Sequence, residues 1–188
     1  MGTPTLIVIS GPGGSGKTTL AHRLARMVGC PALCRDEIKE GMVASNPSFV
    51  PAVSDPLTMR TYDLFFEAIA LFLKAEVTLL AEAGFQHPAW SRGLQPLTDL
   101  AMLKIIRCQV SDEVARQRAL TRMESQPTRA AHADAEHFSV PRTFDAIHFD
   151  APTLDIDTSN GWQPDLEEIA AFCRSESQGL SLRTRSEE

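Results

Sequence analysis

Short, strongly apolar runs recur along the chain, separated by longer segments in which apolar residues have helical spacing. The first run, residues 5–9, is continuous and rich in β-branched side chains. Such a run is typical of a strand that is buried on both faces of a parallel sheet. Similar runs predict strands within residues 31–34, 77–80, 102–110 and 153–156. Helical spacing predicts helices over residues 16–28, 57–75, 90–100, 111–123 and 166–173.

This alternation of strands and helices predicts an α/β fold. We expect a doubly wound parallel sheet of about five strands with helices on both faces. Residues 1–174 should form one domain, in which the irregular, polar segment 124–137 is a small lid. Residues 175–188 lack apolar periodicity and are expected to be a flexible tail.

Polar residues mark where three of the helices should begin. Asp55 followed by Pro56 resembles a helix N-cap and first helical residue, and Ser111 can cap the helix after the fourth strand. Asp36 and Glu37 suit the first turn of a short helix that ends near Gly41. The predicted helix starts therefore agree with the apolar periodicity.

The residues that follow the first strand form a glycine loop, SGPGGSGKTT, which satisfies the pattern G-x-x-x-x-G-K-[ST]. Glycines let backbone N–H groups surround a phosphate without Cβ clashes, and the next helix directs its positive end at the anion. Lys17 should reach the β- and γ-phosphates, and the Thr18 hydroxyl can ligate Mg²⁺. The sequence thus predicts a P-loop that binds ATP and magnesium through Gly11, Gly13, Gly14, Ser15, Gly16, Lys17, Thr18 and Thr19.

Composition and charge restrict the class of protein to which this loop belongs and its expected location in the cell. The 188 residues, 43% of them apolar, are enough for one sizeable core. A net charge of −6 argues against a wrap of long nucleic acid or an anionic membrane surface. None of the four cysteines forms a CxxC pair, and no apolar run reaches membrane-spanning length. We therefore expect reduced core thiols and a cytoplasmic protein without a signal peptide.

The glycine loop does not specify a reaction, but absent motifs restrict the choice. The chain has no N-K-x-D sequence, which a GTPase should carry, and no adenylate-kinase-like D-G-[FY]-P-R run. It is also short for a motor or AAA-type ATPase.

Several motifs, in this order, resemble those of small P-loop kinases grouped around chloramphenicol phosphotransferase, the zeta toxins and polynucleotide 5′-kinase. These motifs extend through much of the chain, and the opening IVISGPGGSGKTTLAHRLA is highly specific for P-loop proteins. The others are RDEIK after the second strand, the strand ending at Glu82, the helix with Arg118 and Arg122, and the late run LDIDTS. The resemblance implies a kinase that transfers the γ-phosphate of ATP to a hydroxyl.

In such families an aspartate just after the second strand contacts the acceptor hydroxyl as general base, and Asp36 is the matching position. The alternative is that Asp36 only favours the start of a helix. Glu82 stands where these proteins often have aspartate. It could hold Mg²⁺ through water, contact the acceptor, or have no metal role.

Arginines of the fifth predicted helix are the remaining candidates. Arg118 and Arg122 lie four residues apart on one helical face, and related kinases close such arginines over the phosphates. We therefore expect them to be catalytic together with Lys17 and Asp36. Arg116, on another face, should be solvated. The roles of Arg129, His132, His137 and Arg142 stay open, and so does the choice for Arg35 and Lys39 between an anionic acceptor and surface charge.

The sequence as a whole favours an ATP-dependent phosphotransferase acting on a hydroxyl of a small molecule. Its rivals are a nucleotide or polynucleotide kinase, and an ATP-binding switch module without an acceptor pocket. The identity of the acceptor and the oligomeric state are not encoded in any motif.

Overall fold

A parallel five-stranded sheet forms the centre of the protein. The structure is a computed structural model that describes residues 2–46, 48–52, 55–132 and 143–175. The strand order is β2-β3-β1-β4-β5, and every neighbouring pair is parallel. The predicted α/β fold with a five-stranded parallel sheet is thereby confirmed. The strands are β1 (Thr5–Ser10), β2 (Ala32–Cys34), β3 (Leu79–Ala83), β4 (Met102–Gln109) and β5 (Thr153–Asp157).

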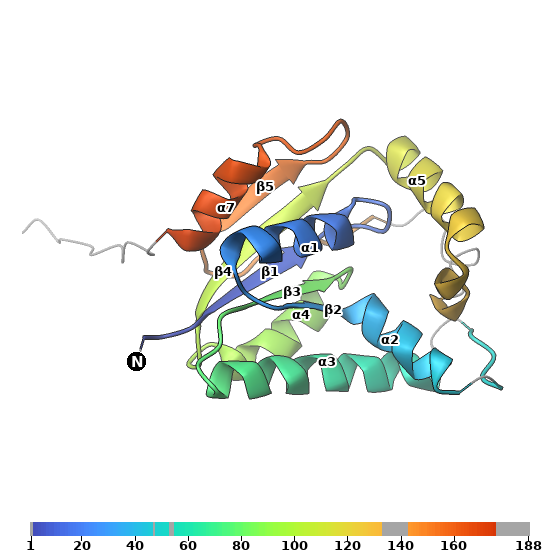
Figure 1. Cartoon of the computed structure of the whole chain (residues 1–188), viewed down its shortest axis with the longest axis horizontal. Helices are drawn as coiled ribbons and strands as arrows, with labels where there is room; N and C mark the ends of the chain where they lie inside the picture. Colours follow the sequence, from blue (N-terminus) through green and yellow to red (C-terminus); the bar gives the residue numbers. More distant parts are fainter. Residues whose placement is uncertain (1, 47, 53–54, 133–142, 176–188) are drawn as a thin grey trace, which may run out of the picture.

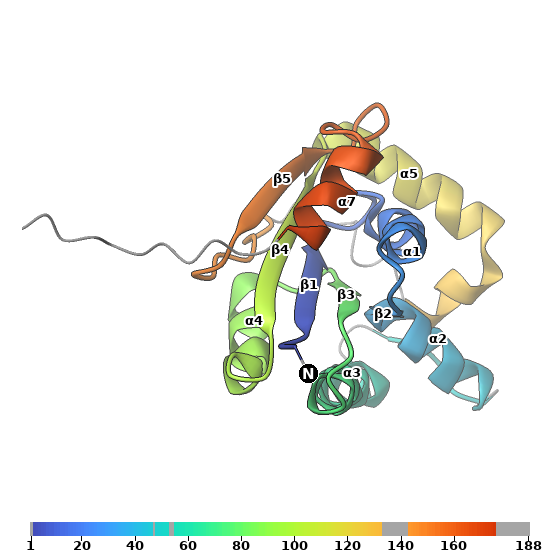
Figure 2. The same ribbon diagram turned by 60° about the vertical axis from the view of Figure 1, so that its left-hand side comes forward.

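Helices cover both faces of this sheet (Figures 1 and 2). One face carries α1 (Lys17–Val28) and α7 (Leu166–Arg174), and the other carries α3 (Pro56–Lys74) and α4 (His87–Leu94) with the short 3₁₀ segment η1 (Gln95–Leu97). Three further elements lie beyond the carboxyl ends of the strands, on the right in Figure 1. They are α2 (Arg35–Ala44), α5 (Asp112–Ser125) and the 3₁₀ segment η2 (Pro127–His132).

The central strand explains why the first apolar run is continuous. Leu6 and Val8 belong to the core cluster beneath α3 and α4, whereas Ile7 and Ile9 belong to the cluster beneath α1 and α7. Because side chains alternate across a strand, both faces of β1 need apolar residues. All four side chains are buried.

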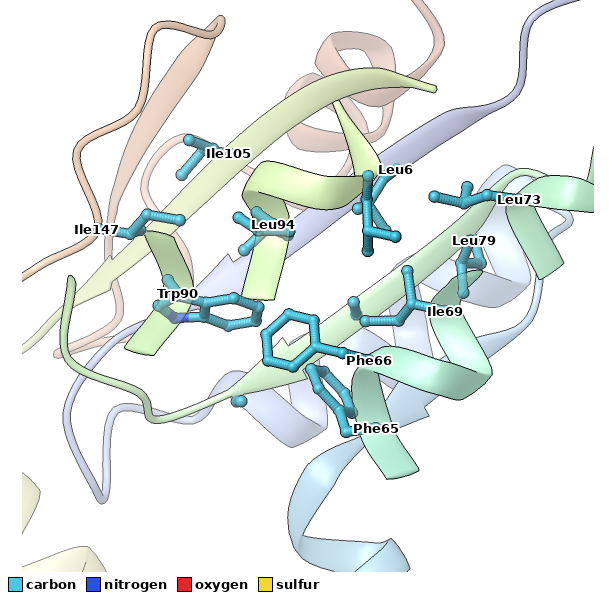
Figure 3. Packing of buried hydrophobic residues seen from close by; sticks show 14 residues of the cluster. Leu6, Phe65, Phe66, Ile69, Leu73, Leu79, Trp90, Leu94, Ile105 and Ile147 are labelled. Carbon is cyan, nitrogen blue, oxygen red and sulfur yellow. The ribbon is translucent and has the colours of Figure 1, made fainter. Parts of the chain in front are cut away.

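Aromatic rings fill the layer between the sheet and α3 and α4. Phe65, Phe66 and Trp90 meet at centroid distances of 5.2–6.0 Å, mostly edge to face (Figure 3). The indole Nε1 of Trp90 donates a hydrogen bond to Ser10 Oγ at 3.0 Å, so its polar atom is satisfied inside the core. Ser10 is the last residue of β1, and this contact therefore fixes the strand end that precedes the glycine loop.

The predicted caps of α3 and α5 are present. Asp55 accepts from the backbone N–H of Thr58, and Ser111 accepts from that of Val114. The sequence prediction missed a complete capping box at the start of α7, where Asp165 and Glu168 bond each other's backbone N–H groups.

Three elements, β3, α4 and α2, have boundaries that differ from prediction. Strand β3 begins at Leu79, because the chain leaves α3 through Glu76 in a left-handed conformation (φ 58°). Helix α4 begins at His87 and ends at Leu94, because Pro88 suits a first turn and Pro96 lacks the N–H that a continuing helix needs. Helix α2 continues past Gly41 to Ala44.

None of the helices in the described ranges combines the length and apolar character that a bilayer crossing requires. Residues 133–142 and 176–188 lie outside the described residues, as does most of the predicted tail and the end of the predicted lid.

We expect Gly93→Ala to destabilise the protein and Gly41→Ala not to. A Cβ at Gly93 would lie 2.2 Å from the Phe66 ring, which is packed within the aromatic layer, whereas a Cβ at Gly41 meets no atom within 4 Å. Overpacking a core costs about 1–3 kcal/mol, whereas alanine in place of helical glycine stabilises by about 0.5–1 kcal/mol. Urea unfolding should move the two midpoints in opposite directions. If the two midpoints were equal, the Phe66 ring would be able to move and accommodate the added methyl group, contrary to this prediction.

Candidate active site

A cavity of about 1300 Å³ opens at the carboxyl ends of the strands. It is bordered by the loop after β1, the ends of β3 and β4, and residues of α2, α5 and η2. In open α/β sheets this edge is where ligands bind. The predicted site residues that line it are Gly11, Gly13, Gly14, Gly16, Lys17, Thr18, Asp36, Glu82, Arg122 and Arg129.

Glycines give the loop after β1 its shape. Gly14 has a φ of 79°, and a Cβ there would lie 2.2 Å from the backbone oxygen of Ala115 in α5. Gly16 also has a positive φ of 76° and immediately precedes α1. Only glycine suits this backbone and this close approach. The loop is therefore held against α5 by backbone contact.

Two residues of the predicted binding set do not face the cavity directly. Ser15 is fully buried and its hydroxyl donates to Pro12 O at 2.8 Å, so it stabilises the loop from within. Thr19 is exposed on α1 and is not among the residues that line the cavity.

Lys17, Thr18 and Glu82 form a compact polar group at the start of α1. Lys17 Nζ donates to Pro12 O at 2.8 Å and lies 4.0 Å from Glu82 Oε1. Thr18 Oγ1 donates to Glu82 Oε2 at 3.0 Å. Glu82 is 3% exposed, and its burial raises the pKa of the carboxyl, a trend that the charge of Lys17 opposes.

This group has the donors that magnesium prefers. A hydroxyl and a carboxylate offer hard oxygen ligands at the foot of the phosphate loop, and Mg²⁺ is usually held by few protein ligands plus phosphates. The substitution of glutamate for the aspartate common here still brings the carboxylate to Thr18. The residues present therefore fit a Mg²⁺ ion.

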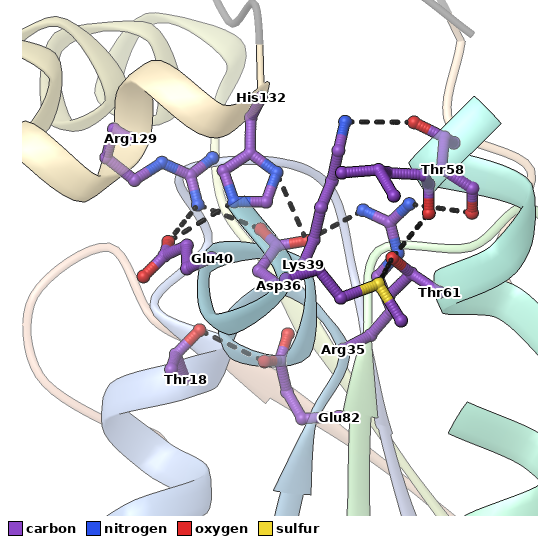
Figure 4. A network of polar contacts seen from close by, with 12 residues as sticks. Thr18, Arg35, Asp36, Lys39, Glu40, Thr58, Thr61, Glu82, Arg129 and His132 are labelled. Atoms are coloured by element: carbon purple, nitrogen blue, oxygen red, sulfur yellow. Dashed lines mark hydrogen bonds and ion pairs between the residues drawn. The ribbon is translucent and has the colours of Figure 1, made fainter. Parts of the chain in front are cut away.

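Asp36 lines the cavity from the start of α2, where basic side chains surround it (Figure 4). Arg35 Nη1 is 3.1 Å from Oδ1, Arg129 Nη1 is 2.9 Å from Oδ2, and His132 Nδ1 is 3.9 Å from Oδ1. Desolvation alone would raise the pKa of Asp36, but His132 and Arg129, followed by Arg35, hold it well below its usual range. Asp36 is therefore an anion at neutral pH.

Arg129 and His132, both in η2, also reach Glu40, one turn along α2. His132 Nε2 is 3.2 Å from Glu40 Oε1, and Arg129 Nη1 is 3.7 Å from that oxygen. His132 and Arg129 have side chains that are only 5% and 10% exposed. The structure thus docks η2 onto α2, whereas His137 and Arg142 lie outside the described residues.

The arginines of α5 are not arranged as predicted. Arg122 lines the cavity, and so does Arg116, whose side chain is exposed, as expected for a solvated arginine. Arg118 does not line it, because its Nη2 donates to the carbonyl oxygens of Thr158 and Ser159 at 2.7 and 3.0 Å. The cavity-facing side of α5 is the one that carries Asp112 and Arg116, and Arg118 lies beyond its edge.

Arg35 and Lys39 are not simple surface charges. Lys39 is 2% exposed, and its Nζ contacts Asp55 Oδ2 at 2.7 Å and Thr58 Oγ1 at 2.9 Å. This buried ion pair ties α2 to the beginning of α3. The Arg35 guanidinium approaches the Phe85 ring at 5.9 Å as well as Asp36. Both residues line the cavity, a position that local sequence did not reveal.

Trp90 and Tyr62 are not among the residues that line the cavity. Trp90 is fully buried in the aromatic layer, and Tyr62 donates from its hydroxyl to Ala89 O. The phenylalanines that do line the cavity are Phe85, which follows β3, and Phe144.

The fold and the glycine loop together define a P-loop domain of the kinase-like class. The chain belongs to the family described as an AAA domain (AAA_33), which matches residues 6–142. Its short length is therefore no argument against membership of an AAA-named family. A search of curated proteins found no match.

Solved structures of kinases share this fold. A protein of Chloroflexus aurantiacus that is presumed to be a kinase is 25% identical, with a TM-score of 0.80 over 92% of this chain and 98% of that one. The APS kinase of Mycobacterium tuberculosis, bound to AMPPNP and APS, is 14% identical, with a TM-score of 0.66 over 93% and 100%. A gluconokinase of Sinorhizobium meliloti is 17% identical, with a TM-score of 0.53 over 92% and 91%. The family and these neighbours support nucleotide binding, whereas the smaller kinase group named above is not singled out.

We expect Lys39→Met to destabilise the protein strongly. It leaves the Asp55 carboxylate, which is 3% exposed at its side chain, without its cationic partner. Breaking one side of a buried pair costs about 3–5 kcal/mol, because an uncompensated charge stays buried. Urea unfolding at neutral pH measures the loss. Lys74→Met, at the exposed end of α3, is the control, and a comparable loss there would contradict the role assigned to the pair.

Proposed function

We propose that this protein is an ATP-dependent kinase that transfers the γ-phosphate of ATP to a hydroxyl of a small molecule. One observation carries the proposal: the glycine loop and Asp36, at the start of α2, line the same cavity. A phosphate bound to the loop and an acceptor hydroxyl beside Asp36 would therefore share one enclosed space. Phosphoryl transfer depends mainly on such positioning and on charge stabilisation.

The nucleotide half of the site consists of the loop, Lys17 and Thr18. Backbone N–H groups from Gly11 to Gly16 would surround the phosphates, and Lys17 would leave Pro12 O to bind the β- and γ-phosphates. A magnesium ion held by Thr18 and Glu82 would neutralise charge that develops on the transferred phosphoryl group. Arg116 and Arg122 line the cavity where that group would lie, and they replace Arg118 in this role.

Asp36 is suited to orient the acceptor rather than to act as a strong base. The cations around Asp36 lower its pKa, so it is ionised at neutral pH but has little affinity for a proton. A low proton affinity is compatible with kinase chemistry, because the loose transition state requires only late proton removal. An acceptor hydroxyl would donate to Asp36 and attack in line with the leaving phosphate.

Arg118 has a supporting part in this scheme. Its two hydrogen bonds to the carbonyls of residues 158 and 159 hold the loop after β5 against α5. The loop lies at the same sheet edge as the glycine loop, so Arg118 would shape the nucleotide end of the cavity without contacting phosphate.

The acceptor class follows from the size of the cavity and from the neighbours. The neighbours include a gluconokinase, and an APS kinase solved with APS, a small molecule. Arg35, Thr58, Phe85 and Gln86 line the cavity near Asp36 and offer hydrogen-bonding groups beside one aromatic face. A compact hydroxylated molecule such as a sugar or a nucleoside derivative would fit these groups.

ADP release from Mg·ATP tests the proposal. Purified protein should release ADP faster with one class of acceptor, and Lys17→Ala should abolish the stimulation because the phosphates lose their cationic ligand. The panel should include sugars, sugar acids, nucleosides, aminoglycosides, phenicols and 5′-hydroxyl oligonucleotides. Stimulation by oligonucleotides alone would favour a polynucleotide kinase. Tight ATP binding without any phosphorylated product would contradict the proposal and favour an ATP-dependent switch.

Asp36→Asn should lower kcat by at least about a hundredfold, the usual contribution of a group that assists proton transfer. Binding of ATP should change little, because Asp36 is not part of the glycine loop that would hold the phosphates. The pKa of Asp36 is lowered, so the ionised form persists down to below about pH 4, and the wild-type rate should show no acidic loss due to Asp36 above that pH. Asp99→Asn, at an exposed turn, is the control. Full turnover by Asp36→Asn would contradict its role.

A further inference from the structure

A second group of metal-ligand side chains lies outside the cavity. His22 on α1, Cys34 at the end of β2 and Glu37 on α2 place one donor atom each within 4.8 Å of one another. Within the described ranges, no other group of three His, Cys, Asp or Glu side chains converges in this way. None of the three is among the residues that line the cavity.

The distances are close to those of a coordination sphere. His22 Nε2 is 3.9 Å from Cys34 Sγ. An ion about 2.1 Å from a nitrogen and about 2.3 Å from a sulfur would span that gap at an angle of roughly 120°. Glu37 Oε1 is 2.7 Å from His22 Nε2, which is closer than two ligands of one ion normally stand. The Glu37 carboxylate would need to move by roughly 0.7 Å to reach tetrahedral spacing.

Exposure allows that adjustment. The side chains of His22 and Glu37 are 47% and 48% exposed, whereas Cys34 is 2% exposed. The sulfur is therefore fixed by the core, and the other two donors can rearrange at the surface. An ion would enter from the solvent side, and water would fill the remaining position.

The mixed donor set selects the kind of ion. A thiolate with an imidazole and a carboxylate suits Zn²⁺ and similar divalent transition metals, whereas Mg²⁺ and Ca²⁺ prefer oxygen ligands alone. The group is thus chemically different from the oxygen pair of Thr18 and Glu82, which suits Mg²⁺.

We propose that His22, Cys34 and Glu37 bind a divalent transition-metal ion of the zinc type, with water as the fourth ligand. The ion would join α1, which begins at the glycine loop, to the start of α2, which carries Asp36. The proposal does not depend on kinase activity.

Binding would require removal of the thiol proton. Burial, with a smaller contribution from the charges of Glu82 and Glu37, raises the pKa of Cys34, so the metal-free side chain is a neutral thiol. A bound cation reverses this preference and releases the proton to solvent, while the sulfur lone pair forms the bond to the metal. The thiol also adjoins Glu82. A metal ion bound here would therefore lie next to the Thr18 and Glu82 oxygens that suit Mg²⁺.

Cobalt is the direct probe. The full chain, freed of metal with a chelator and kept reduced, should bind one equivalent of Co²⁺ with a thiolate-to-cobalt charge-transfer absorption in the near ultraviolet. Zn²⁺ should displace the cobalt and remove that absorption. Zn²⁺ should also raise the melting temperature of the wild type, since a ligand that binds the folded state stabilises it.

Matched variants separate this site from adventitious binding. Cys34→Ser should lose the cobalt absorption, and Cys30→Ser should keep it. His22→Ala and Glu37→Gln should each weaken Zn²⁺ binding by more than about tenfold, because even outer-shell partners of a metal contribute that much. Both side chains are half exposed, so these variants should fold even if Cys34→Ser does not.

Three results would overturn the proposal. They are the absence of cobalt–thiolate absorption in the wild type, its persistence in Cys34→Ser, and wild-type zinc affinity in His22→Ala. Any of these would leave His22 and Glu37 as an exposed ion pair of little energetic weight.

Discussion

Burial of β1 on both faces and pairing on both edges is the constraint on which the rest of the structure depends. Its neighbours β3 and β4 align their ends with its own, so Glu82 and Arg107 stand beside Ile9 and Ser10. The loop that follows β1 must therefore turn where the carboxyl ends of these strands meet, next to α5. The backbone approach of Gly14 to Ala115 and the hydrogen bond from Trp90 to Ser10 hold that turn in place. The geometry of the phosphate loop is thus a consequence of core packing.

Charge balance shapes the part of the cavity that α2 borders. Cationic side chains there are matched by carboxylates: Arg35 and Arg129 by Asp36, and Lys39 by Asp55. Pairing keeps Asp36 ionised and places it firmly, at the cost of its strength as a base. Because Arg129 and His132 make these contacts from η2, an element that borders the cavity also sets the electrostatics of Asp36. Movement of η2 and the charge state of Asp36 would therefore be linked.

Much of the fold could be predicted, because its signals are local. Continuous β-branched runs, helical spacing and the Asp55 and Ser111 caps each depend on residues a few positions apart, and the structure has the corresponding elements. Proline and the left-handed Glu76 shifted element boundaries by only a few residues. Which side chains contact one another in the site was harder to predict from the sequence. Asp36 meets Arg129 and His132 over 90 positions away, and no local pattern encodes such a pairing.

The sequence by itself determined the phosphate loop, the order of strands and helices, and the position of Asp36 after the second strand, since each follows from the residues immediately around it. Only the tertiary structure decided which arginines enter the cavity. Arg116 and Arg118 differ by two positions on one helix, yet the orientation of α5 against the sheet directs the first inward and the second to the loop after β5. That orientation is set by packing across the whole domain, which no short segment of sequence contains.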